Sequence, residues 1–240
     1  MHKIYIMQII SLKSRKLLPS FNLTEELVLS LKKADDRLKE KDVLVITSKA
    51  VALMQNRFVK NGKKQEWVKK EADKILYQSN HGCVTIKDGM IMINAGIDSS
   101  NIKDGIILYP KNLQAWTKKF WQELKKGYKL KKLGLIITDS RTNFLRSGSS
   151  AIACAHAGFE GVEFLAGQPD VFNKKLRHSR VNKADMLANS AVVCMGESNE
   201  QSPFAIIRQA PVKFTDNPKH TLKVRPDQCI YGSLFTAEKR

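Results

Sequence analysis

Three stretches of mainly apolar residues each run into a carboxylate inside a short turn of small or polar residues. The stretches cover residues 90–97, 133–138 and 191–196, and the acids that follow them are Asp98, Asp139 and Glu197. An ionised acid at the mouth of a buried strand needs a cation, a proton or hydrogen-bond donors. If the three turns converge, their carboxylates form a site for a hard divalent metal. Taken alone, each acid is more simply an ordinary turn-capping residue.

The spacing of apolar residues predicts a mixture of helices and strands. Thr24 is placed to cap a helix over residues 24–39, whose first turn is acidic. Helices are also predicted at residues 48–52, 65–77, 113–126 (closed by Gly127), 150–157 and 182–190. Strands are predicted at residues 1–10, 42–47, 82–86, 90–94, 133–138, 192–195, 204–208 and 229–235. Because strands and helices do not alternate strictly, the predicted class is α+β and not a doubly wound sheet.

The chain is strongly basic, with 41 Lys and Arg against 23 Asp and Glu and a formal charge of +18. Such a chain attracts polyanions, which include nucleic acid, nucleotides and multiply charged substrates. The aromatic residues among the lysines of residues 116–132 could form a platform for single-stranded nucleic acid. However, Leu113, Trp116, Phe120 and Leu124 recur at helical spacing, which favours a core-facing helix. We therefore do not expect a nucleic-acid partner.

The same composition gives an expectation for the cellular compartment. No apolar stretch approaches the roughly 20 residues of a membrane helix, and the first ten residues lack the features of a signal peptide. The four cysteines are widely separated, with no Cys-x-x-Cys pair. We expect no membrane partner, and buried free thiols in a reducing cytoplasm rather than disulfides or a zinc site.

Thr47, Ser48 and Lys49 lie between a buried strand and the start of a helix. Backbone N–H groups, two hydroxyls and an ammonium would there face an approaching anion, so one interpretation is phosphate binding. The other interpretation makes Ser48 a helix cap and leaves Lys49 in solvent. The Gly-rich loop of a Walker sequence is missing. His81, in an Asn-His-Gly turn, could present an imidazole, although a lone His is more often a surface or packing residue.

Residues 138–148 form the densest polar segment of the chain. Asp139 and Ser140 resemble a metal-binding pair, and Arg141 and Arg146 could hold phosphates or carboxylates through paired hydrogen bonds. So many hydrogen-bonding side chains favour a functional loop over a plain connection.

With these segments in view, the chain resembles the coenzyme F-420:γ-glutamyl ligase family. The matching stretches are residues 42–49, 81–82, 94–101, 137–140, 146–148, 184–188 and 195–197. The block Asn94-Ala-Gly-Ile-Asp-Ser-Ser-Asn101 is the specific one, and the others are individually modest. The three acids are 41 and 58 residues apart, which is similar to the separation of the family's metal-binding acids.

The resemblance implies a fold of two interleaved α+β domains in a homodimer. The first domain would combine residues 1–80 and 190–240, and the second would cover residues 81–189. It also implies a cytoplasmic enzyme that uses GTP and Mn²⁺ or Mg²⁺. Such an enzyme phosphorylates an acceptor carboxylate, and the amine of L-glutamate then attacks the acyl phosphate to give an amide.

On this resemblance, specific residues receive roles. Asp98, Asp139 and Glu197 would hold the metals with the hydroxyl of Ser140, and Asp139 and Arg146 would act in catalysis. The residues expected to hold the nucleotide or substrate are Thr47, Ser48, Lys49, His81, Asn94 and Ser140.

The chain also departs from the family's pattern. Where the family shows Ser-Lys-x-Glu-Gly-Arg, residues 52–57 retain only the arginine, with Leu53, Gln55 and Asn56 at changed positions. Thr142 replaces a glycine, and Ala151 stands where a further acid is expected. These changes favour a bacterial paralogue with another acceptor, for which a folate-like carboxylate is one candidate. An inactive nucleotide-binding relative and a basic nucleic-acid-binding protein are the alternatives.

Overall fold

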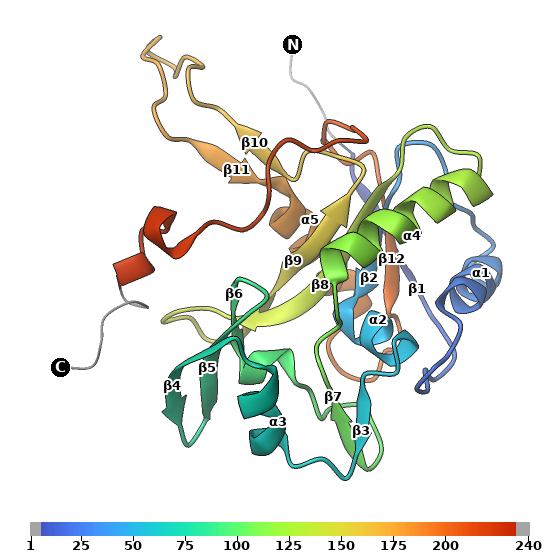
Figure 1. Cartoon of the computed structure of the whole chain (residues 1–240). Coiled ribbons are helices and arrows are strands. Elements are labelled where there is room, and N and C mark those ends of the chain that lie inside the picture. The colour runs from blue at the N-terminus through green and yellow to red at the C-terminus, as the bar shows by residue number, and fades with distance from the viewer. Residues whose placement is uncertain (1–5, 234–240) are drawn as a thin grey trace.

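The computed structural model describes residues 6–233, and its mixture of helices with several sheets confirms the predicted α+β class (Figure 1). The central sheet has the strand order β1-β12-β2-β8-β9. β2 and β8 run parallel, whereas the other neighbours are antiparallel. The bounds of these strands are β1 Gln8–Leu12, β2 Val43–Thr47, β8 Gly134–Thr142, β9 Ser149–Ala157 and β12 Phe204–Arg208.

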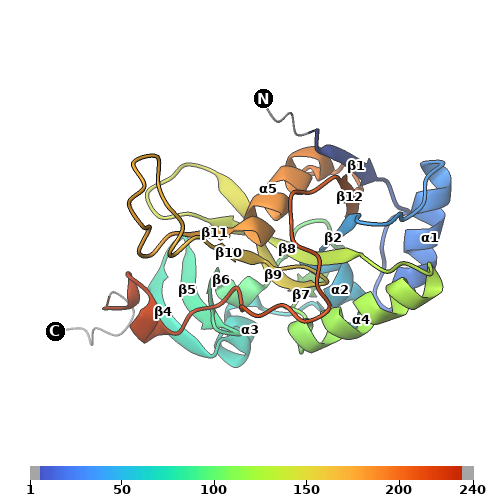
Figure 2. The same cartoon turned by 90° about the horizontal axis from the view of Figure 1, so that it is seen from above.

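Helices cover both faces of the central sheet, which explains why its strands are continuous apolar runs. Alternate side chains of β2 and β12 enter two separate clusters, one on each face. α1, α2 and α4 pack on one face and α5 packs on the other (Figure 2). The helices are α1 Leu23–Lys33, α2 Ser48–Met54, α4 Leu113–Gly127 and α5 Lys183–Met195.

Smaller sheets extend the chain beyond the central one. β4, β5 and β6 form a three-stranded sheet beside α3, β3 pairs with β7, and β10 pairs with β11 in an arm that projects from the body (Figure 1). Their bounds are β3 Phe58–Lys60, α3 Lys64–Glu71, β4 Lys74–Ser79, β5 Gly82–Lys87, β6 Met90–Ile93, β7 Gly105–Ile107, β10 Val162–Phe164 and β11 Arg180–Asn182. The short 3₁₀ helices are η1 Asn94–Gly96 and η2 Pro226–Gln228.

Side chains from two helices form hydrogen bonds with backbone groups on the outer edge of β9, the last strand of the central sheet. Asn189 of α5 accepts a hydrogen bond from the backbone N–H of Ala151 (2.9 Å) and donates to its carbonyl (2.7 Å). Asp185, one turn earlier, accepts from the backbone N–H of Ala153 (2.9 Å). Gln114 of α4 donates to the carbonyl of His156 (2.8 Å). These side chains therefore take the place of a further strand in pairing with the backbone of β9.

Several predicted elements are confirmed. Residues 42–47, 48–52, 82–86, 90–94, 113–126 and 204–208 correspond to β2, α2, β5, β6, α4 and β12, and the strand at 133–138 continues to Thr142 as β8. The first strand begins at Gln8, and residues 1–5 of that prediction lie outside the described part. Leu113, Phe120 and Leu124 of α4 are buried and Trp116 is partly buried, as their helical spacing indicated.

The helix predicted over residues 65–77 is wrong in its second half. α3 ends at Glu71, and Lys74–Ser79 is strand β4, paired with β5. The apolar spacing of this segment is compatible with a helix, but Ile75 and Tyr77 are β-branched and aromatic. Pairing with a distant strand decided between the two states, and local spacing does not report such pairing.

The helix predicted over residues 150–157 is also wrong, because Ser149–Ala157 is strand β9. Its alanines indicate helix by intrinsic propensity. In the structure, Ala151 and Ala153 pack against Ala184 and Ala188 of α5. Small residues are needed on both elements because helix and strand approach closely, so packing overrides propensity.

The ends of two other helices differ from the prediction. Asn22, and not Thr24, caps α1, since its side chain accepts from the N–H of Glu25, and the helix ends at Lys33 rather than residue 39. The strand predicted at residues 192–195 is wrong because α5 continues to Met195 and stops at Gly196, whose φ is 81°. The apolar run before Glu197 is thus the last turn of a helix.

The last predicted strand, at residues 229–235, is wrong over residues 229–233, which adopt bend, turn and helical conformations, while residues 234–235 lie outside the described part. The predicted domain boundaries stay a prediction, although β8 and β9 share one sheet with β1, β2 and β12. In residues 6–233, no helix is both long and apolar enough to cross a membrane.

Candidate functional site

The candidate site lies at one edge of the central sheet. β2 and β8 are parallel neighbours with Thr47 opposite Thr138, so β2 and its pairing with β8 end there, while β8 continues to Thr142 alongside β9. The start of β12 lies at the same edge, because Thr47 donates its N–H to the carbonyl of Pro203 (3.0 Å). In sheets with parallel strands, ligands bind beyond the carboxyl ends of the strands. The fold therefore brings residues 47–49, 138–140 and 196–203 together.

A cavity of about 710 Å³ opens at this edge. Asp98, Asp139 and Glu197 all line it, together with Thr47, Ser48, Lys49 and Ser140. Asp98 enters from outside the central sheet, on the connection between β6 and β7. The volume is within the usual range of about 300–1,000 Å³ for small-molecule sites.

A left-handed turn leads the chain to Asp98. Asn94, Ala95 and Gly96 have φ values of 54°, 54° and 69°. Such a conformation is unfavourable for alanine, and buried hydrogen bonds hold it. Thr85 accepts from the N–H of Ala95 (3.0 Å), and the side-chain oxygen of Asn94 accepts from the N–H of Cys83 (3.0 Å).

Lys49 and Ser100 hold Asp98. The Lys49 Nζ lies 2.6 Å from Oδ2 of Asp98, and the Ser100 N–H donates to Oδ1 (2.7 Å). Burial alone would raise the pKa of Asp98, but the hydrogen bonds and charge of Lys49 and the bonds from Ser100 hold that pKa below its ordinary value. Lys49 therefore lies against a carboxylate and not in open solvent.

Among the described residues, no Lys or Arg side chain forms an ion pair with Asp139. Asp139 accepts hydrogen bonds from the N–H of Ser140 (2.9 Å) and from the hydroxyl of Ser48. Burial raises the pKa of Asp139 to about 6, and the charge of Asp98 adds to that rise. Thr47 is the residue that caps α2, because its hydroxyl accepts from the N–H of Ala50 (3.3 Å), so Ser48 is free to bind the acid.

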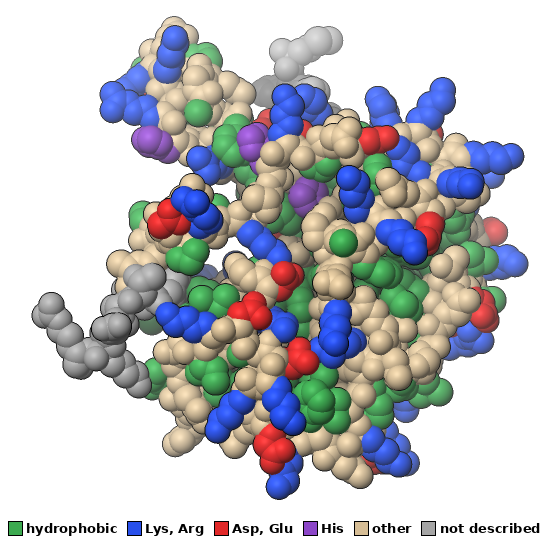
Figure 3. Space-filling model, viewed as in Figure 1, with side chains coloured by type: hydrophobic (Ala, Val, Ile, Leu, Met, Phe, Trp, Pro, Cys, Tyr) green, Lys and Arg blue, Asp and Glu red, His purple; other side chains and the backbone are tan. Residues whose placement is uncertain are grey.

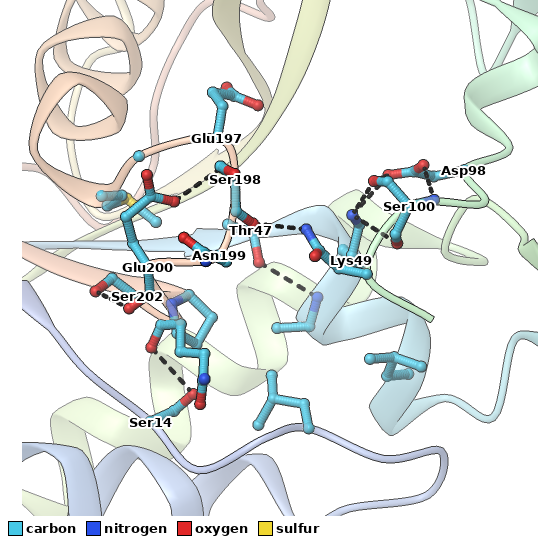
Figure 4. A pocket seen from close by; sticks show the side chains of 18 of the residues that line it. Ser14, Thr47, Lys49, Asp98, Ser100, Glu197, Ser198, Asn199, Glu200 and Ser202 are labelled. Atoms are coloured by element: carbon cyan, nitrogen blue, oxygen red, sulfur yellow. Dashed lines mark hydrogen bonds and ion pairs between the residues drawn. The ribbon is translucent and has the colours of Figure 1, made fainter. Parts of the chain in front are cut away.

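Glu197 follows Gly196 at the end of α5 and is held by Ser140. The Ser140 hydroxyl lies 2.9 and 2.7 Å from the two carboxylate oxygens of Glu197. Asn101 joins the two sides of the cavity by donating to the carbonyl of Ser198 (2.7 Å). In Figure 4, Asp98, Ser100 and Lys49 form one linked group, with Glu197 and Ser198 apart from it.

The three acids share a cavity without yet forming one coordination sphere. In the part of the chain that the structure describes, no three His, Cys, Asp or Glu side chains are gathered closely enough to hold a metal ion. Each acid is held by a neighbouring side chain, namely Lys49, Ser48 or Ser140. The donors are carboxylate and hydroxyl oxygens, which suit Mg²⁺ or Mn²⁺. A partly buried acid with a raised pKa is a group that a cation would stabilise.

Three of the predicted site residues do not reach the cavity. His81 is exposed in the turn between β4 and β5, Arg146 is exposed in the loop between β8 and β9, and Asn94 binds the backbone of Cys83. Their functional roles stay a prediction. Of the cysteines, Cys83 and Cys154 are buried as expected, whereas Cys194 is exposed and Cys229 is half-buried.

The structure also adds residues that the sequence did not indicate. Ser14, Arg15, Lys16 and Leu17 line the far side of the cavity, and Glu200 lines the turn after Glu197. Asn101 ends the specific sequence block and could have been found there. Nothing in the local sequence of residues 14–17 reveals their position, because β1 reaches this edge only through its pairing with β12.

Comparison with known proteins agrees with this arrangement. Residues 11–209 match the family described as F420-0:Gamma-glutamyl ligase. The chain belongs to this family. It is 31% identical over 217 residues to the coenzyme F420:L-glutamate ligase of Methanococcus maripaludis strain S2, covering 81% of this chain and 86% of that protein. The corresponding enzyme of Methanocaldococcus jannaschii is 33% identical, over 77% of this chain and 74% of that protein. The predicted family resemblance is thereby confirmed.

Two departures from the family's pattern have a structural explanation. Asn56 has a φ of 54°, so the residue in place of glycine keeps the left-handed conformation, which asparagine tolerates best after glycine. Gln55 donates to the carbonyl of Lys111 (3.1 Å) and accepts from its N–H (2.8 Å), and neither Gln55 nor Asn56 lines the cavity. Leu53 does line it, which makes part of its wall apolar.

Proposed function

We propose that this chain is a GTP- and divalent-metal-dependent γ-glutamyl ligase that joins L-glutamate to an acceptor carboxylate. The observation that carries the proposal is the convergence of Asp98, Asp139 and Glu197, from three distant segments, on one cavity that also holds Lys49. The relatives are named coenzyme F420:L-glutamate ligases, which supports glutamate as the amine substrate.

The proposed reaction has two balanced steps. An acceptor carboxylate oxygen attacks the γ-phosphorus of GTP, and GDP leaves. The glutamate amine then attacks the acyl carbon, inorganic phosphate leaves and the amine loses a proton, giving an amide. Phosphoryl transfer depends mainly on positioning and on stabilisation of charge. We expect Lys49, at the start of α2, to contact phosphate oxygens of the bound nucleotide, and Lys16 and Lys103 line the same cavity.

Asp98, Asp139, Glu197 and Ser140 would hold Mn²⁺ or Mg²⁺. The bound ions would supply neutralisation of the charge that develops between phosphate and carboxylate. Ser48 would orient Asp139 by its hydrogen bond, as residues behind a ligand commonly do. The hydroxyl of Ser140 already lies against Glu197, so that pair is held in place in advance.

The acceptor is proposed to be a carboxylate of a folate-like or deazaflavin-like molecule that differs from the deazaflavin coenzyme itself. Leu53 lines the cavity where the family pattern has lysine, and Ala151 is buried against α5 where the pattern has an acid. These two changes alter the surroundings of the phosphates and of β9, and they favour an acceptor other than the deazaflavin coenzyme.

Lys and Arg side chains are spread across the face in Figure 3 and are not gathered into one patch. The cavity itself is lined by four basic and four acidic residues, which are Arg15, Lys16, Lys49 and Lys103 with Asp98, Asp139, Glu197 and Glu200. This distribution favours a bounded anionic substrate over a long nucleic acid.

Incorporation of labelled glutamate tests the function directly. The purified chain is incubated with GTP or ATP, with Mn²⁺ or Mg²⁺, and with folate or deazaflavin acceptors. Label in an acceptor product together with release of phosphate supports the ligase. Nucleotide binding without phosphate release for any acceptor identifies the inactive relative instead.

A thermal-shift experiment tests the site separately. GTP with Mn²⁺ should raise the melting temperature, because ligands that bind the folded state stabilise it. Asp139→Asn should abolish that rise. Asp227→Asn is the matched control, since Asp227 is exposed and pairs with Arg225 away from the cavity. An unchanged shift in Asp139→Asn would remove this acid from the metal site.

We also propose that the chain forms a homodimer. Leu145 and Phe172 lie fully exposed or nearly so, at 104% and 87%, and each stands at the tip of a projecting hairpin. Ile230 is 89% exposed, and Tyr231 contacts Phe144 with ring centroids 6.3 Å apart. Clusters of exposed large apolar side chains mark interaction surfaces. Light scattering coupled to size-exclusion chromatography should give twice the mass of one chain.

A further inference from the structure

The ammonium group of Lys49 is bound entirely by the turn at residues 98–100. It lies 2.6 Å from Oδ2 of Asp98, 3.0 Å from the Ser100 hydroxyl oxygen and 3.3 Å from the Ser100 carbonyl oxygen. An ammonium has three N–H donors, so these three oxygens satisfy it. Figure 4 shows Lys49 linked to this turn across the cavity.

The oxygens around Lys49 are of the kinds that a hard cation selects. A carboxylate, a hydroxyl and a backbone carbonyl are all ligands of Mg²⁺-like and Ca²⁺-like ions. The monovalent Lys49 ammonium therefore lies at the Asp98 carboxylate, where the proposed function requires a divalent ion. The two cations cannot share the Oδ2 atom of Asp98 without strong repulsion, because like charges a few ångströms apart repel strongly in a partly buried site.

We propose that the Lys49 ammonium occupies the position of the metal at Asp98. It competes with the metal for this carboxylate and, once displaced, pairs with the phosphates of the nucleotide. The inference rests on the proposed metal- and nucleotide-dependent function and assigns Lys49 a second role within it. The flexible four-carbon stem of lysine allows the ammonium to change partners while its backbone stays on α2.

This exchange couples the two ligands. Metal entry at Asp98 releases a positive charge into the cavity, and the released charge favours an anionic triphosphate. By linkage, the nucleotide must favour metal binding by the same factor. Before metal binds, the ion pair keeps Asp98 neutralised, so the cavity does not hold an uncompensated buried acid.

Titration of the nucleotide-free chain with MnCl₂ tests the competition. Lys49→Met should bind Mn²⁺ at least about fivefold more tightly than the unchanged chain, because a competing unit charge has been removed. Lys49→Arg, which retains the charge, should not. Lys118→Met is the matched control, because Lys118 is exposed on α4 and does not line the cavity. It should leave Mn²⁺ affinity within about twofold.

Titration with GTP at saturating Mn²⁺ tests the release. Lys49→Met should now weaken nucleotide binding by about tenfold, the opposite sign to its effect on Mn²⁺ alone. A purely structural role would instead weaken both. Equal or weaker Mn²⁺ binding by Lys49→Met overturns the competition, and unchanged GTP affinity overturns the release. If no variant and not even the unchanged chain binds Mn²⁺, the proposed function itself fails, which is a distinct result.

Discussion

Replacing Asn189 by alanine should destabilise the chain by about 1.5–5 kcal/mol. The Asn189 side chain makes two hydrogen bonds to the backbone of Ala151, on the outer edge of β9, and a third to the carbonyl of Asp185. Ala151 is only 2% exposed, so water does not readily replace the lost partners. The substitution therefore leaves a buried N–H and a buried C=O without their partner.

The magnitude follows from these two groups. Each buried backbone group left unsatisfied costs about 1–3 kcal/mol. Alanine recovers about 0.6 kcal/mol relative to asparagine through its better helix propensity in α5. The substitution should also disturb the candidate site. Ala151 lies opposite Ser140 in the pairing of β8 with β9, and the Ser140 hydroxyl holds Glu197.

Urea unfolding followed by circular dichroism measures the difference in stability. Ser190→Ala on the same helix is the control: its hydroxyl donates only to the carbonyl of Met186, one turn earlier, and the change should stay within about 0.5 kcal/mol. A decrease of less than about 1 kcal/mol in the free energy of unfolding of Asn189→Ala would refute the view that α5 side chains satisfy the backbone hydrogen bonds at this edge of the sheet.

Three further predictions follow from other contacts. Burial lowers the pKa of His156 to about 4 from an ordinary 6.5, so the unfolded chain takes up a proton before the folded chain does as the pH falls. About 3 kcal/mol of the free energy of unfolding should therefore be lost between pH 6.5 and 4. Urea unfolding of His156→Leu at a series of pH values should lack this loss. Ser48→Ala removes a hydrogen bond to Asp139 and should weaken Mn²⁺ binding about tenfold by titration calorimetry, whereas an unchanged affinity would mean that this bond does not orient the acid. Leu145→Asp or Phe172→Asp should halve the mass measured by light scattering, and a dimer that survives both would place the interface elsewhere.

The sequence predicted elements whose local pattern agrees with their packing. β2 is a continuous apolar run because it is buried on both faces, and α4 carries one apolar stripe because only one face is buried. β9 was predicted wrongly because its alanines are required by the close approach of α5, a contact between segments that are far apart in the sequence. β4 was missed because its identity depends on pairing with β5.

The candidate site could be predicted where an apolar run leads directly into an acid. Asp98, Asp139 and Glu197 were identified in this way and line one cavity, although Asp139 lies within β8 and the run before Glu197 is the end of helix α5. The side chains that form hydrogen bonds or ion pairs with each acid could not be predicted. That Ser48 binds Asp139 while Thr47 caps the helix depends on the parallel register of β2 and β8, which no local pattern reports.

Asp98 belongs to the connection between β6 and β7, whereas Asp139 and Glu197 belong to the central sheet and the turn after α5. A ligand that draws these oxygens together must therefore fix one structural layer against another. Its arrival should be detectable at a distance, as slower amide hydrogen exchange along β6 and in the left-handed turn at Asn94, well before any product is formed.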